Sequence, residues 1–218
     1  MAVDETRKYI TQHCDLLLAD FLCDGDDERF LYLLKDDDDT RDQILESPEL
    51  LRMLADPSNR GLPTILRQYV GIRRAFLAHG IRSKDAADYT ARVVCHLSTR
   101  MSWKGSEPWC FPRDYLGKLM VRMHQSVLSG DVLSLRLTLA NYLMYITGMR
   151  PDIVDAHVDR GDPGHQIYDG ICSDNFRLSA DNPLASTTPD HQKLYAYLGD
   201  RVPKIRVALN EFMTTPYV

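Results

Sequence analysis

The sequence predicts an all-α protein, a single domain in which about eight helices pack around a hydrophobic central helix at residues 132–147. Apolar residues recur at three- and four-residue spacing along most of the chain, and no β-branched runs alternate with the helical segments. In addition, 44% of the 218 residues are hydrophobic. A chain of this length buries about 70% of its unfolded surface, which is enough for a core without disulfides or metals.

The N-terminal quarter predicts short helices separated by acidic and turn-forming residues. Asp4 suits the N-cap of the first helix. The four carboxylates of 36–39 repel one another and should end the second helix. Helix resumes near Thr40, and Ser47 followed by Pro48 should restart it as a cap and a first helical residue. The later ranges expected here are 27–35 and 40–54, followed by a turn at 56–63.

Stronger helical patterns follow, each with a boundary signal. Gly80 suits a left-handed C-cap, and Ser83 and Asp131 suit N-caps. The helix after Asp131 has apolar residues around nearly its whole circumference, so it should lie at the centre of the bundle. Gly148 and Pro151 should end it. The ranges expected here are 62–78, 83–101, 113–128 and 132–147.

The helical pattern weakens after the central helix. Loosely spaced apolar residues predict a shorter helix at 165–178, and an exposed connection follows at 180–190. A final helix is expected at 190–213, and Pro203 should kink it or split it in two.

Charge is distributed unevenly along the chain, although the formal net charge is only −5. Residues 1–60 hold 7 basic and 16 acidic side chains, a net charge of −9. Residues 61–150 hold 13 and 5, a net charge of +8, and residues 151–218 hold 6 and 10, a net charge of −4. Either the acidic N-terminal helices pack on the basic helical core at 61–213, or the basic segment holds an anionic partner. The overall acidity argues against nucleic acid as that partner.

The five cysteines indicate a reduced, cytoplasmic setting, because their number is odd and no two form a CxxC pair. The N-terminal residues lack the apolar segment of a secretory signal. The longest apolar stretch, 137–146, is about half the length of a membrane span, so no association with a membrane is expected.

Two groups of residues are candidates for binding. The connector 102–114 contains Trp103 and Trp109, which either complete the core or form a contact surface. Arg136 and Asn141 lie within the central helix and need polar partners if they are buried. A buried arginine that faces a cavity would suit an anionic ligand.

Motifs for metal, phosphate or nucleophilic chemistry are missing from the sequence. It contains no HExxH, GxxxxGK[ST], GxGxxG or GxSxG. The nearest metal-like group is Asp155-Ala-His157-Val-Asp159, and acidic residues beside histidine are common in loops. We therefore expect neither a metal nor another cofactor.

The segments NYLMYITGMRPDIV and GHQIYDGICSDNFRLSA resemble a pattern in uncharacterised bacterial all-helical proteins of similar length. That pattern has a tyrosine-rich apolar helix, a Gly-x-x-Pro break, and a tyrosine and glycine in the next helix. The resemblance covers about residues 139–180, implies a helix at 165–180, and implies no activity. The matching residues are Asn141, Tyr142, Gly148, Pro151, Tyr168 and Gly170.

The leading functional hypothesis is a non-enzymatic cytoplasmic helical module of bacterial type that binds a ligand or a protein and forms a homodimer. The alternative is an enzyme acting on an anionic small molecule near the end of the central helix. Its candidate residues are Arg136, Arg150, His165 and Tyr168. The enzyme hypothesis requires at least two of these side chains in one solvent-reachable pocket.

Overall fold

The computed structural model describes residues 38–56, 64–101, 117–118, 121, 132–183 and 189–214. Throughout these residues the regular structure is helical and contains no strand, so the predicted all-α class is confirmed. Backbone contacts divide the chain into two compact units, with the boundary between Cys95 and His96. Of the described residues, unit 1 takes in 38–56, 64–95 and 214, and unit 2 takes in 96–101, 117–118, 121, 132–183 and 189–213. The single domain expected from the sequence stays a prediction.

Unit 1 contains α3 (Asp38–Leu45), α4 (Pro48–Ala55), α5 (Thr64–Ala78) and the larger part of α6 (Lys84–Met101). The predicted interruption at Ser47 is confirmed, because its hydroxyl accepts a 3.1 Å hydrogen bond from the backbone of Leu50 and Pro48 begins α4. The expectation that Asp36–Asp39 would interrupt the helix as far as Thr40 is wrong for its last two residues. Helix α3 begins at Asp38, and carboxylates in a first turn interact favourably with the helix dipole.

The turn between α5 and α6 follows its sequence signals. Gly80 has a φ of +69°, and Ile81 donates a 2.7 Å hydrogen bond back to the carbonyl of Phe76. Ser83 accepts a 3.1 Å hydrogen bond from the backbone of Ala86, as expected of an N-cap. The core of this unit is formed by buried residues of all four helices and of the turn between α5 and α6, among them Leu45, Leu50, Leu54, Val70, Ile72, Phe76, Ile81, Ala86 and Val94.

Ion pairs connect the acidic α3–α4 segment of unit 1 to the basic α5–α6 segment. Arg73, which is 4% exposed, donates from Nε to Glu46 at 2.9 Å and from Nη1 to the carbonyl of Arg82 at 3.1 Å. Lys84 pairs with Asp42 and lies 3.4 Å from Asp39. For Arg73 and Lys84, therefore, the anionic partners lie within the chain itself.

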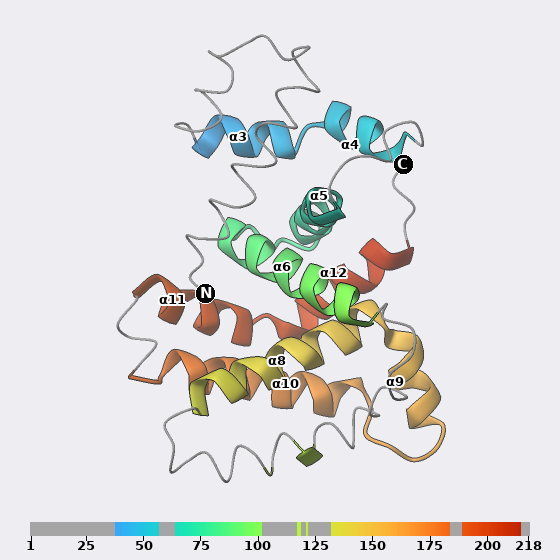
Figure 1. The fold of residues 1–218 in the computed structure, drawn as a ribbon, viewed down its shortest axis with the longest axis vertical. Coiled ribbons are helices and arrows are strands. Elements are labelled where there is room, and N and C mark those ends of the chain that lie inside the picture. The colour runs from blue at the N-terminus through green and yellow to red at the C-terminus, as the bar shows by residue number, and fades with distance from the viewer. Residues whose placement is uncertain are drawn as a thin grey trace. The chain divides into compact units, whose positions relative to one another are not determined.

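Unit 2 contains α8 (Val132–Met149), α9 (Pro151–Val158), α10 (His165–Ala180), α11 (Pro189–Gly199) and α12 (Val202–Thr214). Helices α8 and α10 lie side by side (Figure 1). They are antiparallel, because Arg136 contacts the carbonyl of Leu178 and the Cys172 thiol contacts that of Ala140. The second half of α8 is buried along nearly its whole circumference, as predicted for a central helix.

Two proline positions explain where the helices of unit 2 differ from the expected ranges. Pro151 ends α8 as predicted, but it also begins α9, a helix that the sequence analysis missed, because proline suits a first helical position. The expected helix at 190–213 is split into α11 and α12, and Pro203 lies in the first turn of α12.

Several expected elements lie outside the described residues. These are the first two helices, all but the first residue of the turn at 56–63, the connector 102–114 and nearly all of the helix at 113–128. In the described part of the chain, none of the helices combines the length and the apolar character needed to span a membrane.

Candidate ligand-binding site

The contacts of unit 2 do not bring the four candidate catalytic residues together. Arg136 contacts Leu178 near the C-terminal end of α10, whereas His165 begins that helix, about 20 Å away along its axis. Arg150 pairs with both carboxylate oxygens of Asp152, at 3.1 and 2.9 Å, and is 43% exposed. This pairing raises the pKa of Arg150 and lowers that of Asp152. Tyr168 is buried in the core.

The other sequence-predicted residues do not add to a site. Asn141 is half-buried on α8. Arg136 is also half-buried, with its Nε unpaired. Trp103 and Trp109 lie outside the described residues. Of the predicted residues, His165 is the one from which a polar cluster can be built.

His165 is held by Asp155 of α9, whose Oδ1 lies 2.9 Å from Nε2 of the imidazole. The connection between α9 and α10 makes this contact possible. Gly161 adopts a φ of +86°, and His157 lies 2.9 Å from Asp162 across the same turn. The metal-like group in the sequence is therefore divided between two separate histidine–aspartate pairs. Across the described residues, no three side chains of the His, Cys, Asp or Glu type form a group that could hold a metal ion.

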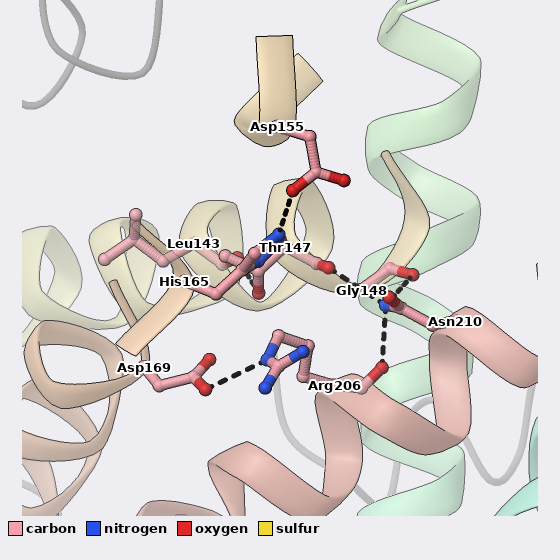
Figure 2. Close-up of polar contacts among 8 residues, drawn as sticks. All are labelled: Leu143, Thr147, Gly148, Asp155, His165, Asp169, Arg206 and Asn210. Atoms are coloured by element: carbon pink, nitrogen blue, oxygen red, sulfur yellow. Dashed lines mark hydrogen bonds and ion pairs between the residues drawn. The ribbon is translucent and has the colours of Figure 1, made fainter. Parts of the chain in front are cut away.

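Asp169 follows His165 by four residues, so the two side chains share one face of α10. Its carboxylate is 7% exposed, and Oδ2 accepts a 2.9 Å hydrogen bond from Nε of Arg206 in α12. Figure 2 shows the resulting arrangement, in which Asp155, His165, Asp169 and Arg206 bring α9, α10 and α12 together. We call these four residues the polar cluster.

The polar cluster lies beside a fixed helix end. Asn210, one turn after Arg206, donates to the carbonyls of Thr147 and Gly148 in the last turn of α8 (Figure 2). Thr147 is buried, and its hydroxyl donates to the carbonyl of Leu143 at 2.8 Å. These contacts fix α12, and thus Arg206, relative to α8 before any ligand arrives.

The polar cluster contains buried polar atoms that have no partner. Oδ1 of Asp169 and Nδ1 of His165 are both buried and form no hydrogen bond. When the imidazole is neutral, its proton lies on Nε2, which faces the carboxylate of Asp155, and Nδ1 presents a lone pair. A buried acceptor without a donor costs about 1–3 kcal/mol, and more when it is charged. A hydrogen-bond donor from outside the protein would therefore stabilise both atoms.

Arg206 complements these acceptors with donors. Its side chain is 23% exposed and forms its ion pair through Nε alone. The two terminal nitrogens of the guanidinium make no hydrogen bond and are not among the buried unpaired atoms, so they are open to solvent. The polar cluster thus joins open donors on Arg206 to a carboxylate, Asp169, whose other oxygen is a buried acceptor.

Asp169, Arg206 and Asn210 are not among the residues predicted from the sequence. One signal was present: His165 and Asp169, and likewise Arg206 and Asn210, are polar pairs at four-residue spacing on amphipathic helices. That spacing places each pair on one face, but it does not say which faces meet. Asp155 belongs to the metal-like group of the sequence, which does not predict its contact with His165.

Comparison of the chain with protein-family models, curated proteins and solved structures finds no match. The resemblance to uncharacterised bacterial helical proteins, and the helical ranges that it implies, therefore rests on the residues named above. What the polar cluster can bind is inferred from its charges, burial and hydrogen bonds.

Proposed function

We propose that this protein is a non-enzymatic helical module that binds a small polar molecule at the polar cluster. The observation that supports the proposal is the pair of buried, unpartnered acceptors, Asp169 Oδ1 and His165 Nδ1, beside the open donors of Arg206. Native proteins rarely leave such atoms unpaired, and an atom without a protein partner often forms its hydrogen bond with a water or a ligand. The site lies near the C-terminal end of the central helix.

A small molecule is a better candidate than a protein partner at this location. The unpaired acceptors are buried, so a protein surface would reach them only through one inserted side chain. A small ligand places its own donors there directly. Partner proteins, homodimer formation and the cytoplasmic setting stay predictions, and the buried free thiol of Cys172 is compatible with a reducing compartment.

Native mass spectrometry of freshly purified full-length protein tests the proposal. We expect a retained small molecule on the wild-type chain, and its loss in Asp169→Asn and Arg206→Gln. A matched control is available, since Arg177 and Asp200 also form an arginine–aspartate pair, with side chains 53% and 59% exposed. Arg177→Gln should keep the bound molecule. A bound molecule that survives both cluster variants would contradict the proposed site.

A second function is supported by one observation, the hydrogen bond between Asp155 and His165. A carboxylate that orients an imidazole whose other nitrogen is unpaired is an arrangement used for general-base catalysis. The enzyme hypothesis would then depend on His165, Asp155 and Arg206 in place of Arg136, Arg150 and Tyr168. Incubation of the retained molecule with wild-type protein and with His165→Gln decides between the two. A chemical change that requires His165 would indicate an enzyme, and an unchanged molecule would indicate a binding module.

A further inference from the structure

The polar cluster also indicates which class of molecule it holds, and this inference rests on the proposed function. We infer that the ligand carries an ammonium group and a carboxylate on neighbouring atoms, which is the head group of a free α-amino acid. The charges, burial and spacing of the cluster support this assignment in three steps.

Two buried acceptors of the polar cluster suit an ammonium group. Asp169 Oδ1 and His165 Nδ1 are two buried acceptors that project from one face of α10, one turn apart. One nitrogen with several N–H bonds can donate to both, since an ammonium carries three donors and no acceptor. The polar cluster holds two carboxylates and one guanidinium, a formal charge of −1 with His165 neutral. This charge favours a cationic donor over a neutral one.

The guanidinium of Arg206 suits a carboxylate. The terminal nitrogens of Arg206 form a planar fork that matches the two oxygens of a carboxylate. Asp169 occupies the Nε edge of the guanidinium, so the fork stays available to a ligand. Two hydrogen bonds between Arg206 and a ligand carboxylate would also satisfy the donors that the guanidinium shows to solvent.

The ammonium and the carboxylate of the ligand must lie close together. Asp169 and Arg206 are themselves in contact at 2.9 Å, so the buried acceptor of Asp169 and the solvent-facing donors of Arg206 belong to one ion pair. A ligand that satisfies both must carry its opposite charges equally close together. An α-amino acid has one carbon between its ammonium and its carboxylate, whereas a phosphate, a simple amine or a simple carboxylate satisfies half of the cluster.

The experiment measures thermal unfolding and calorimetric titration of the full chain with defined probes. The first probes are the free α-amino acids, added in small groups. For each amino acid that binds, the next probes are its analogue without the carboxylate, its analogue without the amine and its primary amide. Inorganic phosphate is a further probe. We expect a free α-amino acid to raise the melting temperature by about 5 °C at about 100 times its Kd. Removal of either charged group from the probe should weaken binding at least tenfold.

Variants connect that binding to the cluster. Asp169→Asn and Arg206→Lys should each weaken binding at least tenfold, because the first removes the charged acceptor and the second removes the fork. Arg177→Gln and Asp200→Asn alter the exposed pair and should leave the affinity unchanged. In the wild-type protein, the Nε–H signal of Arg206 should shift in the NMR spectrum when the amino acid is added. This second readout keeps the inference testable if a cluster variant does not fold.

The outcomes separate the inference from the proposed function. If phosphate, an amine, a primary amide or a simple acid binds as tightly and requires Asp169 and Arg206, the ligand class is wrong and the binding function stands. If no probe binds and native mass spectrometry finds no retained molecule, the cluster holds water only, and both proposals fail. If an amino acid binds equally well to every variant, the assigned site is wrong.

Discussion

The side-chain amide of Asn210 in α12 donates a hydrogen bond of 2.9 Å to the carbonyl oxygen of Gly148 in the last turn of α8. The same nitrogen lies 3.0 Å from the carbonyl oxygen of Thr147 and 2.8 Å from that of Arg206. The final carbonyls of a helix have no partner within the helix, so Asn210 acts as a C-cap supplied by another helix. This cap fixes the helix end beside the polar cluster.

Asn210→Ala should lower the free energy of unfolding by about 1–2 kcal/mol, because the final carbonyls of α8 lose a part-buried donor. Urea denaturation measured by circular dichroism tests this. Lys204→Ala, an exposed change on the same helix, should cost less than about 0.5 kcal/mol and is the control. Equal effects of the two variants would show that the cap contributes nothing specific.

Gly148→Ala should destabilise the protein although alanine favours helix. A methyl group at this position would lie 2.6 Å from Cδ1 and 2.9 Å from Cβ of Leu209, where α8 meets α12. Overpacking of this kind costs about 1–3 kcal/mol. Gly170→Ala in α10, where the methyl group meets no atom within 4 Å, should instead stabilise the protein by about 0.5–1 kcal/mol.

The two glycine variants are compared by thermal and urea unfolding. A further variant, Gly148→Ala with Leu209→Ala, should lose less stability than the sum of the single changes, because the shorter side chain removes the clash. A stabilising Gly148→Ala would mean that the two helices separate at little cost.

Arg73→Gln should lower the free energy of unfolding by about 2–3 kcal/mol. Loss of one partner from a buried ion pair costs about 3–5 kcal/mol, and the 34% exposure of the Glu46 side chain reduces that penalty here. Urea denaturation and a double-mutant cycle with Glu46→Gln measure the coupling. Arg74→Gln alters the exposed neighbouring arginine and should have a small effect. A negligible coupling energy would show that the acidic and basic segments of unit 1 are not joined through this pair.

Cys172 should resist alkylation in the native protein at mildly alkaline pH. Burial, followed by the nearby charge of Asp169, raises the pKa of its thiol, so very little reactive thiolate forms. Peptide mapping after timed exposure to iodoacetamide should show Cys95, which is partly exposed, modified well before Cys172. Denaturant should remove the difference, and rapid native labelling of Cys172 would contradict its buried position.

Asp152 should titrate below the usual range of an aspartate, because its hydrogen bond with Arg150 lowers its pKa. A folded-state pKa below the unfolded value contributes stability above the unfolded pKa, and this is lost as the pH falls through the folded pKa. The contribution should stay below about 1 kcal/mol, because the side chains of Arg150 and Asp152 are 43% and 64% exposed. Carboxyl-carbon NMR titration tests this, and Arg150→Gln should raise the pKa of Asp152. An unchanged pKa in that variant would rule out Arg150 as the cause.

Local sequence predicts several elements of this structure correctly. The ranges of α5 and α6, the cap at Ser83 and the left-handed Gly80 agree with the structure, because each depends on residues within a few positions. Helix α9 was missed because a proline that ends one helix also suits the start of another. Of the seven residues chosen as binding candidates, His165 alone belongs to the polar cluster.

The sequence by itself determined the all-α class, the helix boundaries set by capping residues, and the buried character of the central helix. Periodicity and caps are local, so they can be recognised without knowing which helices touch. Tertiary structure alone decided that Arg206 pairs with Asp169, 37 positions earlier, and that Asn210 caps a helix ending some 60 positions before it. Such pairs depend on how helices pack, and many arrangements of the same amphipathic faces satisfy the same sequence pattern.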